Sequence, residues 1–67
     1  MPYVNIKITR EGGTTKEQKR RLIHGVTNLL QEVLNKSPAS THVTIDEIET
    51  SNWGLGGESV EQLRKRQ

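Results

Sequence analysis

The sequence predicts an α+β fold, a single β-α-β unit with a C-terminal hairpin, in which a two-layer sandwich is completed by oligomerisation. Two segments alternate apolar and polar residues, and a long segment with helical spacing separates them. The chain has 67 residues, of which 30% are hydrophobic, so its own core is small. We expect a single domain over residues 1–67, with a frayed tail at 59–67.

Two strands are expected, over residues 2–9 and His42–Ile48. In the first, apolar residues occupy every second position from Val4 to Ile8, which is the period of a half-buried strand. In the second, β-branched residues alternate with polar ones, although the apolar face is thin. Both segments are therefore predicted to cover a hydrophobic layer with one side and to face solvent with the other.

A helix is expected between the strands. Thr14, followed three residues later by Glu17, has the spacing of a capping box, so the helix should begin at Thr15. Pro38 prevents continuation, and the helix should end near Asn35. A helical crossover of this length joins parallel strands. The apolar residues that recur with a period near 3.6 are Leu22, Ile23, Val26, Leu29, Leu30 and Val33.

Glycines mark two further features. Gly25 lies within the predicted helix, where it costs about 1 kcal/mol relative to Ala, and the close approach of another backbone would explain it. The segment 52–57 is too rich in glycine for a helix and predicts a tight hairpin or loop at the surface of a neighbouring copy. After it, Ser59 and Gln62 have the spacing to cap a final short helical turn.

A chain this small needs a source of stability beyond its core. Cysteine is absent, which excludes disulfides, and His24 and His42 lack the neighbouring ligands that a structural zinc site requires. Oligomerisation remains, and two strands under one helix also leave sheet edges open for pairing with other copies. We therefore expect a homo-oligomer without a structural metal.

Hydropathy and charge limit the cellular locations and the classes of partner that we expect for this protein. No apolar run approaches the roughly 18 residues of a membrane span, and the start of the chain lacks the basic and apolar regions of a signal peptide. We expect a cytoplasmic protein without a membrane partner. The net charge of +2 and the pI near 9.3 suit an anionic ligand or a nucleic acid.

The amino terminus is the main candidate for chemistry, because nucleophile motifs and phosphate-binding loops are missing. Removal of Met1 exposes the secondary amine of Pro2. A terminal amine has a pKa of about 7.7–8.0, which an apolar pocket or nearby cations would lower toward neutrality, where a general base works best. Taken alone, however, a proline at the first residue of a strand is more simply structural.

Several features occur in an order and spacing that resembles 4-oxalocrotonate tautomerase, over Pro2 to Glu58. They are an amino-terminal proline, an alternating strand, Thr-x-x-Glu-Gln-Lys at 14–19, an amphipathic helix, and Asn52-Trp53-Gly54-Leu55-Gly56-Gly57-Glu58. The resemblance implies a tautomerase-like fold that commonly assembles as a hexamer, here a trimer of dimers.

The resemblance also implies an activity. The protein would be a cofactor-independent keto-enol tautomerase, an isomerase of the 2-hydroxymuconate tautomerase type, acting on a small unsaturated 2-hydroxy or 2-oxo acid. Pro2 would act as the general base after removal of Met1. It would take a proton from the enol, or from the carbon next to a carbonyl, and return it elsewhere along the conjugated acid.

Substrate-binding residues follow from the resemblance only in part. Family members wall the pocket with an aromatic residue, and Trp53 occupies that place. They also use two arginines, often across subunits, but here the loop position falls near Gly13 or Thr14 and the strand-two position is His42. Arg10 is the nearest cationic substitute, and its planar fork can engage a carboxylate with two hydrogen bonds. The alternatives are a solvated turn charge for Arg10 and a structural role for His42.

Two other functions stay open. The basic charge and the short strand before a basic helix also suit a small nucleic-acid-binding dimer, although the tautomerase interpretation predicts no nucleic-acid partner. A tautomerase fold could also have a non-catalytic role, or catalyse hydration or dehalogenation. Such reactions usually need an extra carboxylate to activate water, and Glu11, Asp46 and Glu47 are the candidates.

Overall fold

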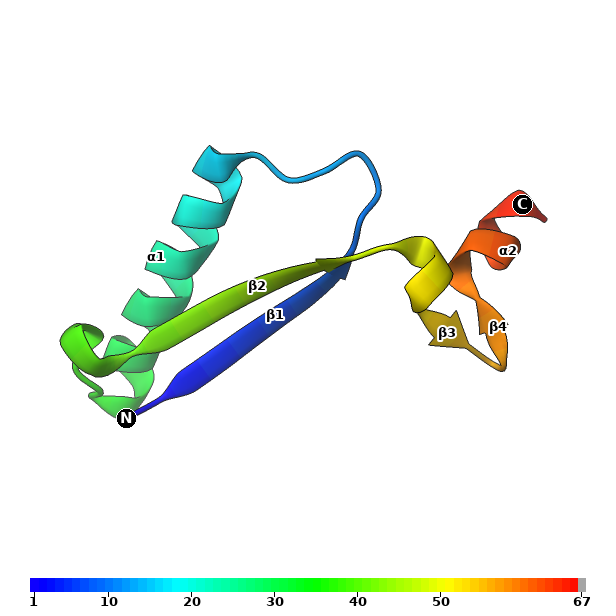
Figure 1. The fold of residues 1–67 in the computed structure, drawn as a ribbon. Coiled ribbons are helices and arrows are strands. Elements are labelled where there is room, and N and C mark those ends of the chain that lie inside the picture. Colours follow the sequence, from blue (N-terminus) through cyan, green and yellow to red (C-terminus); the bar gives the residue numbers. More distant parts are fainter. Residues whose placement is uncertain (67) are drawn as a thin grey trace.

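The computed structural model describes residues 1–66, and its helices and strands follow the predicted order (Figure 1). In chain order they are β1 (Tyr3–Thr9), α1 (Lys16–Leu34), β2 (His42–Ile48), β3 (Gly54–Leu55), β4 (Glu58–Ser59) and α2 (Val60–Lys65). Short 3-10 turns at Pro38–Ser40 and Thr50–Asn52 precede and follow β2. The predicted β-α-β unit with a C-terminal hairpin is confirmed.

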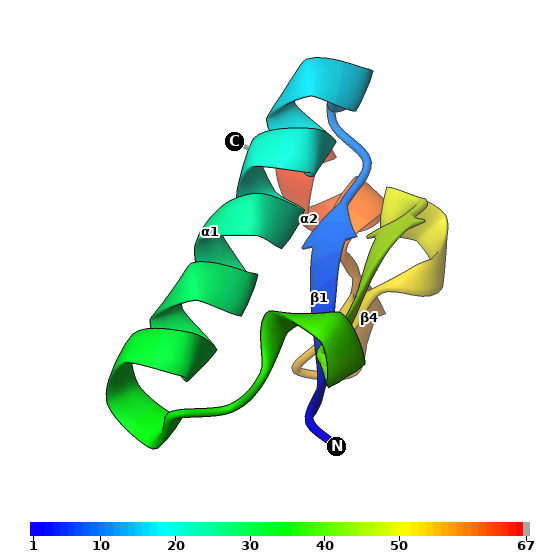
Figure 2. The same ribbon diagram turned by 90° about the vertical axis from the view of Figure 1, so that its left-hand side faces the viewer.

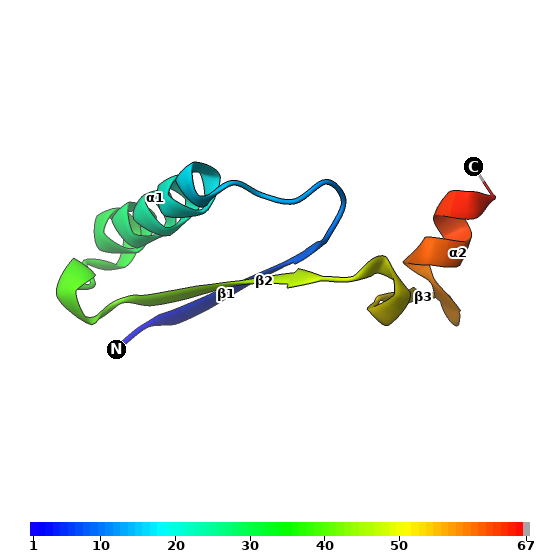
Figure 3. The ribbon, with the colours of Figure 1, turned by 45° about the horizontal axis from the view of Figure 1, so that its top comes forward.

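β1 and β2 pair in parallel, in register from Tyr3 opposite His42 to Thr9 opposite Ile48. α1 lies on one side of this pair, as Figures 2 and 3 show from two directions. Successive side chains of a strand point to opposite sides, so the apolar positions of both strands gather under the helix. The residues on this side are Val4, Ile6 and Ile8 of β1 and Val43, Ile45 and Glu47 of β2. Glu47 is the charged residue among these six.

The opposite side of the sheet carries a row of polar side chains that bridge the strands. The Tyr3 hydroxyl lies 2.9 Å from Thr44 Oγ1, and the Asn5 amide donates to Thr44 Oγ1 at 2.7 Å and to Asp46 Oδ2 at 3.0 Å. Lys7 Nζ donates to Asp46 Oδ2 at 3.0 Å. Hydrogen bonding from Asn5, and then from Lys7 with its positive charge, holds the pKa of Asp46 below its usual range.

The start of α1 differs from the sequence expectation by one residue. Thr15, not Thr14, is the N-cap: its Oγ1 accepts from the Gln18 backbone N–H at 3.0 Å, and Gln18 Oε1 accepts from the Thr15 N–H at 3.0 Å. The capping box is therefore Thr15 and Gln18 in place of Thr14 and Glu17. The helix ends as predicted, because Asn35 takes the left-handed conformation at the C-cap with φ 56°.

The structure also tests two smaller expectations, one about Gly25 and one about the C-terminal segment. A Cβ added to Gly25 would have no atom within 4 Å, apart from its chain neighbours and the nearby backbone of α1 itself. Within residues 1–66, therefore, no other backbone approaches α1 closely at Gly25. The predicted cap of a final short helical turn is confirmed, because Ser59 is the N-cap of α2 and accepts from the Gln62 N–H at 3.3 Å. Within the segment where we expected fraying, Val60–Lys65 is therefore helical. Gln67 lies outside the described residues.

The chain is extended for its size. Its radius of gyration is 15.3 Å, against about 11 Å for a compact chain of this length. Its accessible surface is 5194 Å², against roughly 4,300 Å² for a compact monomer of this mass. Within residues 1–66 Val60 alone is buried, and α1 leaves Leu29, Val33 and Leu34 exposed. The arm of β3, β4 and α2 projects away from the sheet (Figure 1), so the described chain has no large core.

The exposed apolar residues of α1 predict that stable folding requires association between chains. We expect the Tm to rise with protein concentration, because only an assembly buries this surface. Leu29→Arg and Val33→Arg, at positions 56% and 69% exposed, should lower the Tm and yield smaller species in analytical ultracentrifugation. In a monomer, substitutions at such exposed positions change stability by only about 0.5 kcal/mol or less. Gln31→Arg, on an exposed polar position of the same helix, is the control. A Tm independent of concentration would contradict this expectation.

The polar row on the outer side of the sheet predicts a pH dependence of stability. The pKa of Asp46 is lowered in the folded chain, so the ionised carboxylate adds to the free energy of unfolding. This stabilisation is complete above the ordinary pKa of about 3.9 and is lost as pH falls through the lowered value. Asp46→Asn should therefore be less stable than wild type at pH 7, and the difference should shrink in acid. High salt should also reduce it, because the Lys7–Asp46 pair is exposed. Thermal unfolding between pH 2 and 7 at fixed concentration measures this, and a difference that is constant across pH would refute it.

Candidate active site

Pro2 and His42 lie at the same end of the sheet. The His42 backbone N–H donates to the Pro2 carbonyl oxygen at 2.9 Å, which continues the pairing of β1 and β2 one step beyond Tyr3. Pro2 is half-buried and His42 is exposed. The structure therefore brings these two predicted site residues together and holds the backbone of Pro2 in place. Their roles stay predictions.

Arg10 and Trp53 lie beyond the other end of the sheet. The Arg10 N–H donates to the Ile48 carbonyl oxygen at 2.7 Å, at the point where β1 and β2 separate. Trp53 follows the 3-10 turn at Thr50–Asn52, and its carbonyl oxygen accepts from the Val60 N–H at 2.7 Å. Trp53 is half-buried, and the turn that carries it leads into the projecting arm (Figure 1).

The four predicted site residues do not meet within one chain. Eight residue steps at about 3.3 Å each along an extended strand separate Pro2 from Arg10 by roughly 26 Å. Parallel pairing places the two strand starts at one end of the sheet and the two strand ends at the other. A pocket that contains both Pro2 and Arg10 therefore needs more than one chain.

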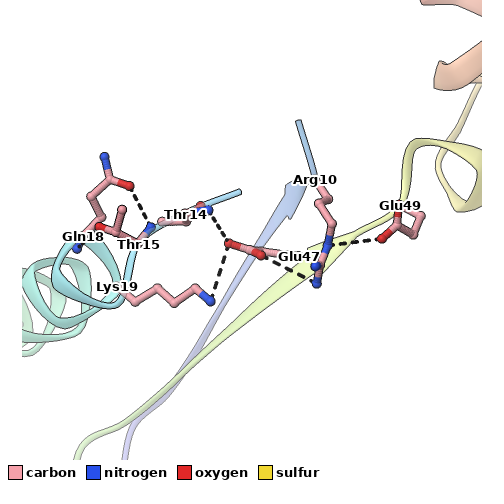
Figure 4. A network of polar contacts seen from close by, with 7 residues as sticks. All are labelled: Arg10, Thr14, Thr15, Gln18, Lys19, Glu47 and Glu49. Carbon is pink, nitrogen blue, oxygen red and sulfur yellow. Dashed lines mark hydrogen bonds and ion pairs between the residues drawn. The ribbon is translucent and has the colours of Figure 1, made fainter. Parts of the chain in front are cut away.

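Arg10 is held by two carboxylates, as Figure 4 shows. Its Nη2 lies 3.6 Å from Glu47 Oε2, and its Nε lies 3.2 Å from Glu49 Oε1. The Arg10 side chain is 52% exposed, so the guanidinium remains accessible while its direction is set by these ion pairs. Arg10 is thus an exposed cation with two ion-pair partners, and its role stays a prediction.

Glu47 contacts Arg10, and its position on the helix side of the sheet was not predicted from the sequence. Its side chain is 8% exposed, and its Oε1 accepts from the Thr14 backbone N–H at 3.0 Å and lies 3.6 Å from Lys19 Nζ. Hydrogen bonding from Thr14 lowers the pKa of Glu47, partial burial opposes this shift, and the charges of Lys19 and Arg10 add to it. Glu47 therefore stays ionised at neutral pH.

A second contact ties the loop to the C-terminal arm. Arg64 Nε donates to Glu11 Oε1 at 2.8 Å, and the Thr9 hydroxyl donates to the other carboxylate oxygen of Glu11. Hydrogen bonding from Arg64 is the main cause of a lowered pKa of Glu11. Between Glu11 and Thr14, Gly12 and Gly13 both have positive φ, 91° and 78°, which allows the chain to turn back toward α1.

A shallow hollow between the end of β1, the following loop and α1 contains none of the four predicted site residues; it is lined by Ile8, Gly13, Thr14, Gln18, Arg21 and Leu22. The described residues hold no group of three or more His, Cys, Asp or Glu side chains suited to a metal ion. None of their helices is both long enough and apolar enough to cross a membrane.

Comparison with known sequences identifies relatives over nearly the whole chain. The profile of the family described as Tautomerase enzyme matches residues 2–63. The chain is 59% identical over 66 residues to the probable tautomerase K2 of Dickeya dadantii (strain 3937), covering 98% of this chain and 97% of that protein. It is 33% identical over 63 residues to a 2-hydroxymuconate tautomerase of Comamonas testosteroni, covering 94% and 97% respectively.

Solved structures agree with this relationship. The crystal structure of DmpI from Helicobacter pylori matches with a TM-score of 0.87 at 52% identity, covering 98% of this chain and 100% of that chain. A heterohexamer 4-oxalocrotonate tautomerase from Chloroflexus aurantiacus J-10-fl matches with a TM-score of 0.79 at 25% identity, covering 96% and 100%. The resemblance and the fold predicted from the sequence are thus confirmed. The chain belongs to the tautomerase family and is an isomerase of the tautomerase type.

Proposed function

We propose that this protein is a cofactor-independent keto-enol tautomerase of a small unsaturated 2-hydroxy or 2-oxo acid, with Pro2 as the general base after removal of Met1. The observation that carries the proposal is the anchored position of Pro2. It is half-buried at the first step of the sheet, where the His42 N–H fixes its carbonyl oxygen at 2.9 Å. Two relatives at 33% identity, from Comamonas testosteroni and Pseudomonas putida, are 2-hydroxymuconate tautomerases.

The proposed mechanism uses the rigid ring of Pro2. While Met1 is present, the Pro2 nitrogen is an amide and holds no basic lone pair. Removal of Met1 leaves a terminal amine, and a terminal amine with the ordinary pKa of about 7.7–8.0 is neutral in roughly a tenth of the molecules at pH 7 and in roughly half of them at pH 8. It takes a proton from the enol, or from the carbon next to the carbonyl, and returns the same proton elsewhere along the conjugated acid. The reaction has no net change in atoms or electrons.

The proposed substrate contacts come from two chains. His42 of the chain that supplies Pro2 donates a hydrogen bond to a carboxylate or carbonyl oxygen. Arg10 and Trp53 of a neighbouring copy bind the carboxylate and exclude water, because their own chain holds them at the far end of the sheet. The exposed apolar side chains of α1 support such contacts between copies. We propose a homohexamer, a trimer of dimers; a hexameric relative is known from Chloroflexus aurantiacus J-10-fl.

The described contacts favour neither alternative function. Glu11, Asp46 and Glu47, the candidates for activating water in a hydratase, all have lowered pKa values and partners of their own. Part of the positive charge that a nucleic-acid surface would use is paired within the chain, Lys19 with Glu47, Arg20 with Glu17 and Arg64 with Glu11. Tautomerisation is therefore the function that the geometry supports best.

An amino-terminally extended protein, in which the Pro2 nitrogen is an amide, should ketonise 2-hydroxymuconate or phenylenolpyruvate roughly 10²–10⁴ times more slowly, because a positioned general base contributes about that much. Ultraviolet absorbance follows the reaction, with removal of Met1 from the wild type verified by mass spectrometry. Pro2→Ala should lose a smaller part of the rate, because it keeps a terminal amine but lacks the ring that fixes the direction of the lone pair. Asn28→Ala, at an exposed position of α1, is the control. Equal rates for wild type and the extended protein would refute the amino-terminal nitrogen as the base.

Mixing two impaired variants tests whether each pocket is shared between two chains. Arg10→Ala should lower kcat/KM by roughly tenfold to a hundredfold, because it removes a charged hydrogen-bond donor. If Pro2 and Arg10 of one pocket belong to different chains, co-expressed Pro2→Ala and Arg10→Ala chains should form about one intact pocket in four by random assembly. Activity near a quarter of wild type is the expected result. A mixture no more active than the two separate variants would place Pro2 and Arg10 of each pocket on one chain, or show that Arg10 has no part in the reaction.

A further inference from the structure

The two carboxylates beside Arg10 differ in their surroundings. The Glu47 side chain is 8% exposed and lies on the helix side of the sheet, next to Ile8 of β1. The Glu49 side chain is 60% exposed and follows the end of β2. Both approach the same guanidinium, Glu47 at Nη2 and Glu49 at Nε. One partner of Arg10 is therefore nearly enclosed by protein and the other lies in solvent.

Glu47 joins three segments of the chain, as Figure 4 shows. One carboxylate oxygen accepts from the Thr14 N–H at 3.0 Å and lies 3.6 Å from Lys19 Nζ on the first turns of α1. The other lies 3.6 Å from Arg10 Nη2 at the start of the loop. The loop between β1 and α1 is thus attached to β2 near both of its ends by one side chain.

The attachment lies directly before the helix. Thr14, whose N–H donates to Glu47, is the residue that precedes the N-cap Thr15. The loop includes Gly12 and Gly13, which supply little restraint of their own. The direction of Arg10 therefore depends on contacts outside the loop, and Glu47 supplies a contact at each end of it.

We propose that Glu47 is a positioning residue that fixes the loop of residues 10–15 and the direction of the Arg10 guanidinium, whereas Glu49 is the exposed partner that a substrate carboxylate displaces. The inference rests on the proposed function, because it takes Arg10 as the group that binds the carboxylate. Displacement at Nε leaves the contact of Nη2 with Glu47 intact, so Arg10 keeps its direction while it exchanges one carboxylate for another.

Two matched substitutions separate positioning from simple electrostatics. Glu47→Gln and Glu49→Gln each remove one negative charge beside Arg10 and preserve side-chain size. If charge alone mattered, both would tighten binding of an anion. Positioning predicts opposite effects: Glu49→Gln lowers the Kd of phenylpyruvate by about threefold, because a competing ion pair is removed, and Glu47→Gln raises it by about fivefold, because Arg10 loses its fixed direction.

The Kd is measured by titrating phenylpyruvate while following the Arg10 Nε–H signal in nitrogen-15 NMR spectra, assigned by its loss in Arg10→Lys. Hydrogen exchange of the Thr14 amide gives an independent readout, because it should become faster in Glu47→Gln and stay unchanged in Glu49→Gln. If Glu47→Gln does not fold, Glu47→Asp decides the question. It keeps the charge but shortens the side chain, so positioning predicts weaker binding and electrostatics alone predicts no change.

The outcomes are distinct from those of the proposed function. Tighter or unchanged binding in the Glu47 variants would overturn the positioning role, as would a lowered Tm with an unchanged Kd. Wild-type protein that does not bind phenylpyruvate through Arg10 would overturn it as well. Opposite shifts in Kd without turnover that depends on Pro2 would support the positioning role and refute the tautomerase mechanism.

Discussion

The parallel pairing of β1 with β2 through the crossover helix α1 is the constraint on which the other features of this chain depend. It brings the two strand starts together, so that Pro2 and His42 are joined by a backbone hydrogen bond. It also brings the two strand ends together, where Arg10 bonds to Ile48 and pairs with Glu49. In an antiparallel pair, the start of each strand would lie beside the end of the other, so Pro2 and His42 would be at opposite ends of the sheet. The parallel arrangement instead gives the sheet two chemically different ends.

The lack of a large core is the second constraint, and like the first it favours association between chains. Within residues 1–66 Val60 alone is buried, and the radius of gyration of 15.3 Å exceeds that of a compact chain. The chain therefore has an exposed apolar surface that must be covered for stability. The two ends of its sheet are also too far apart to form one pocket. In the proposed assembly, contacts between copies satisfy both needs together, so stability and activity depend on the same association.

Local patterns were sufficient to predict most of the fold. The strand His42–Ile48 was located to the residue, because alternation and β-branching are properties of adjacent positions. The end of α1 near Asn35 and the hairpin after Trp53 were also found, because proline stops a helix and glycine permits the positive φ of a tight turn, and both effects are local. The helix start was misplaced by one residue because Thr14 with Glu17 and Thr15 with Gln18 both have the spacing of a capping box, and the sequence does not show which of the two forms.

The candidate site was harder to predict than the fold, since its residues are brought together by contacts between distant segments. Pro2 and His42 are far apart in sequence and became neighbours only through the strand register. Glu47 had a usable signal: it follows Val43 and Ile45 at alternate positions, so the alternation places a carboxylate on the apolar side of a strand. Charged residues are rarely found there without partners, and a search for those partners would have led to the loop that carries Arg10.

The exposed helix surface has a consequence for the life of the newly made chain. If the proposed assembly forms, each newly made chain displays Leu29, Val33 and Leu34 until it meets another copy. That waiting time is set by a second-order encounter, so it lengthens as expression falls. Solitary chains offer apolar side chains and unpaired strand edges to proteases and chaperones throughout this interval. The steady-state level of the protein should therefore fall more steeply than its rate of synthesis.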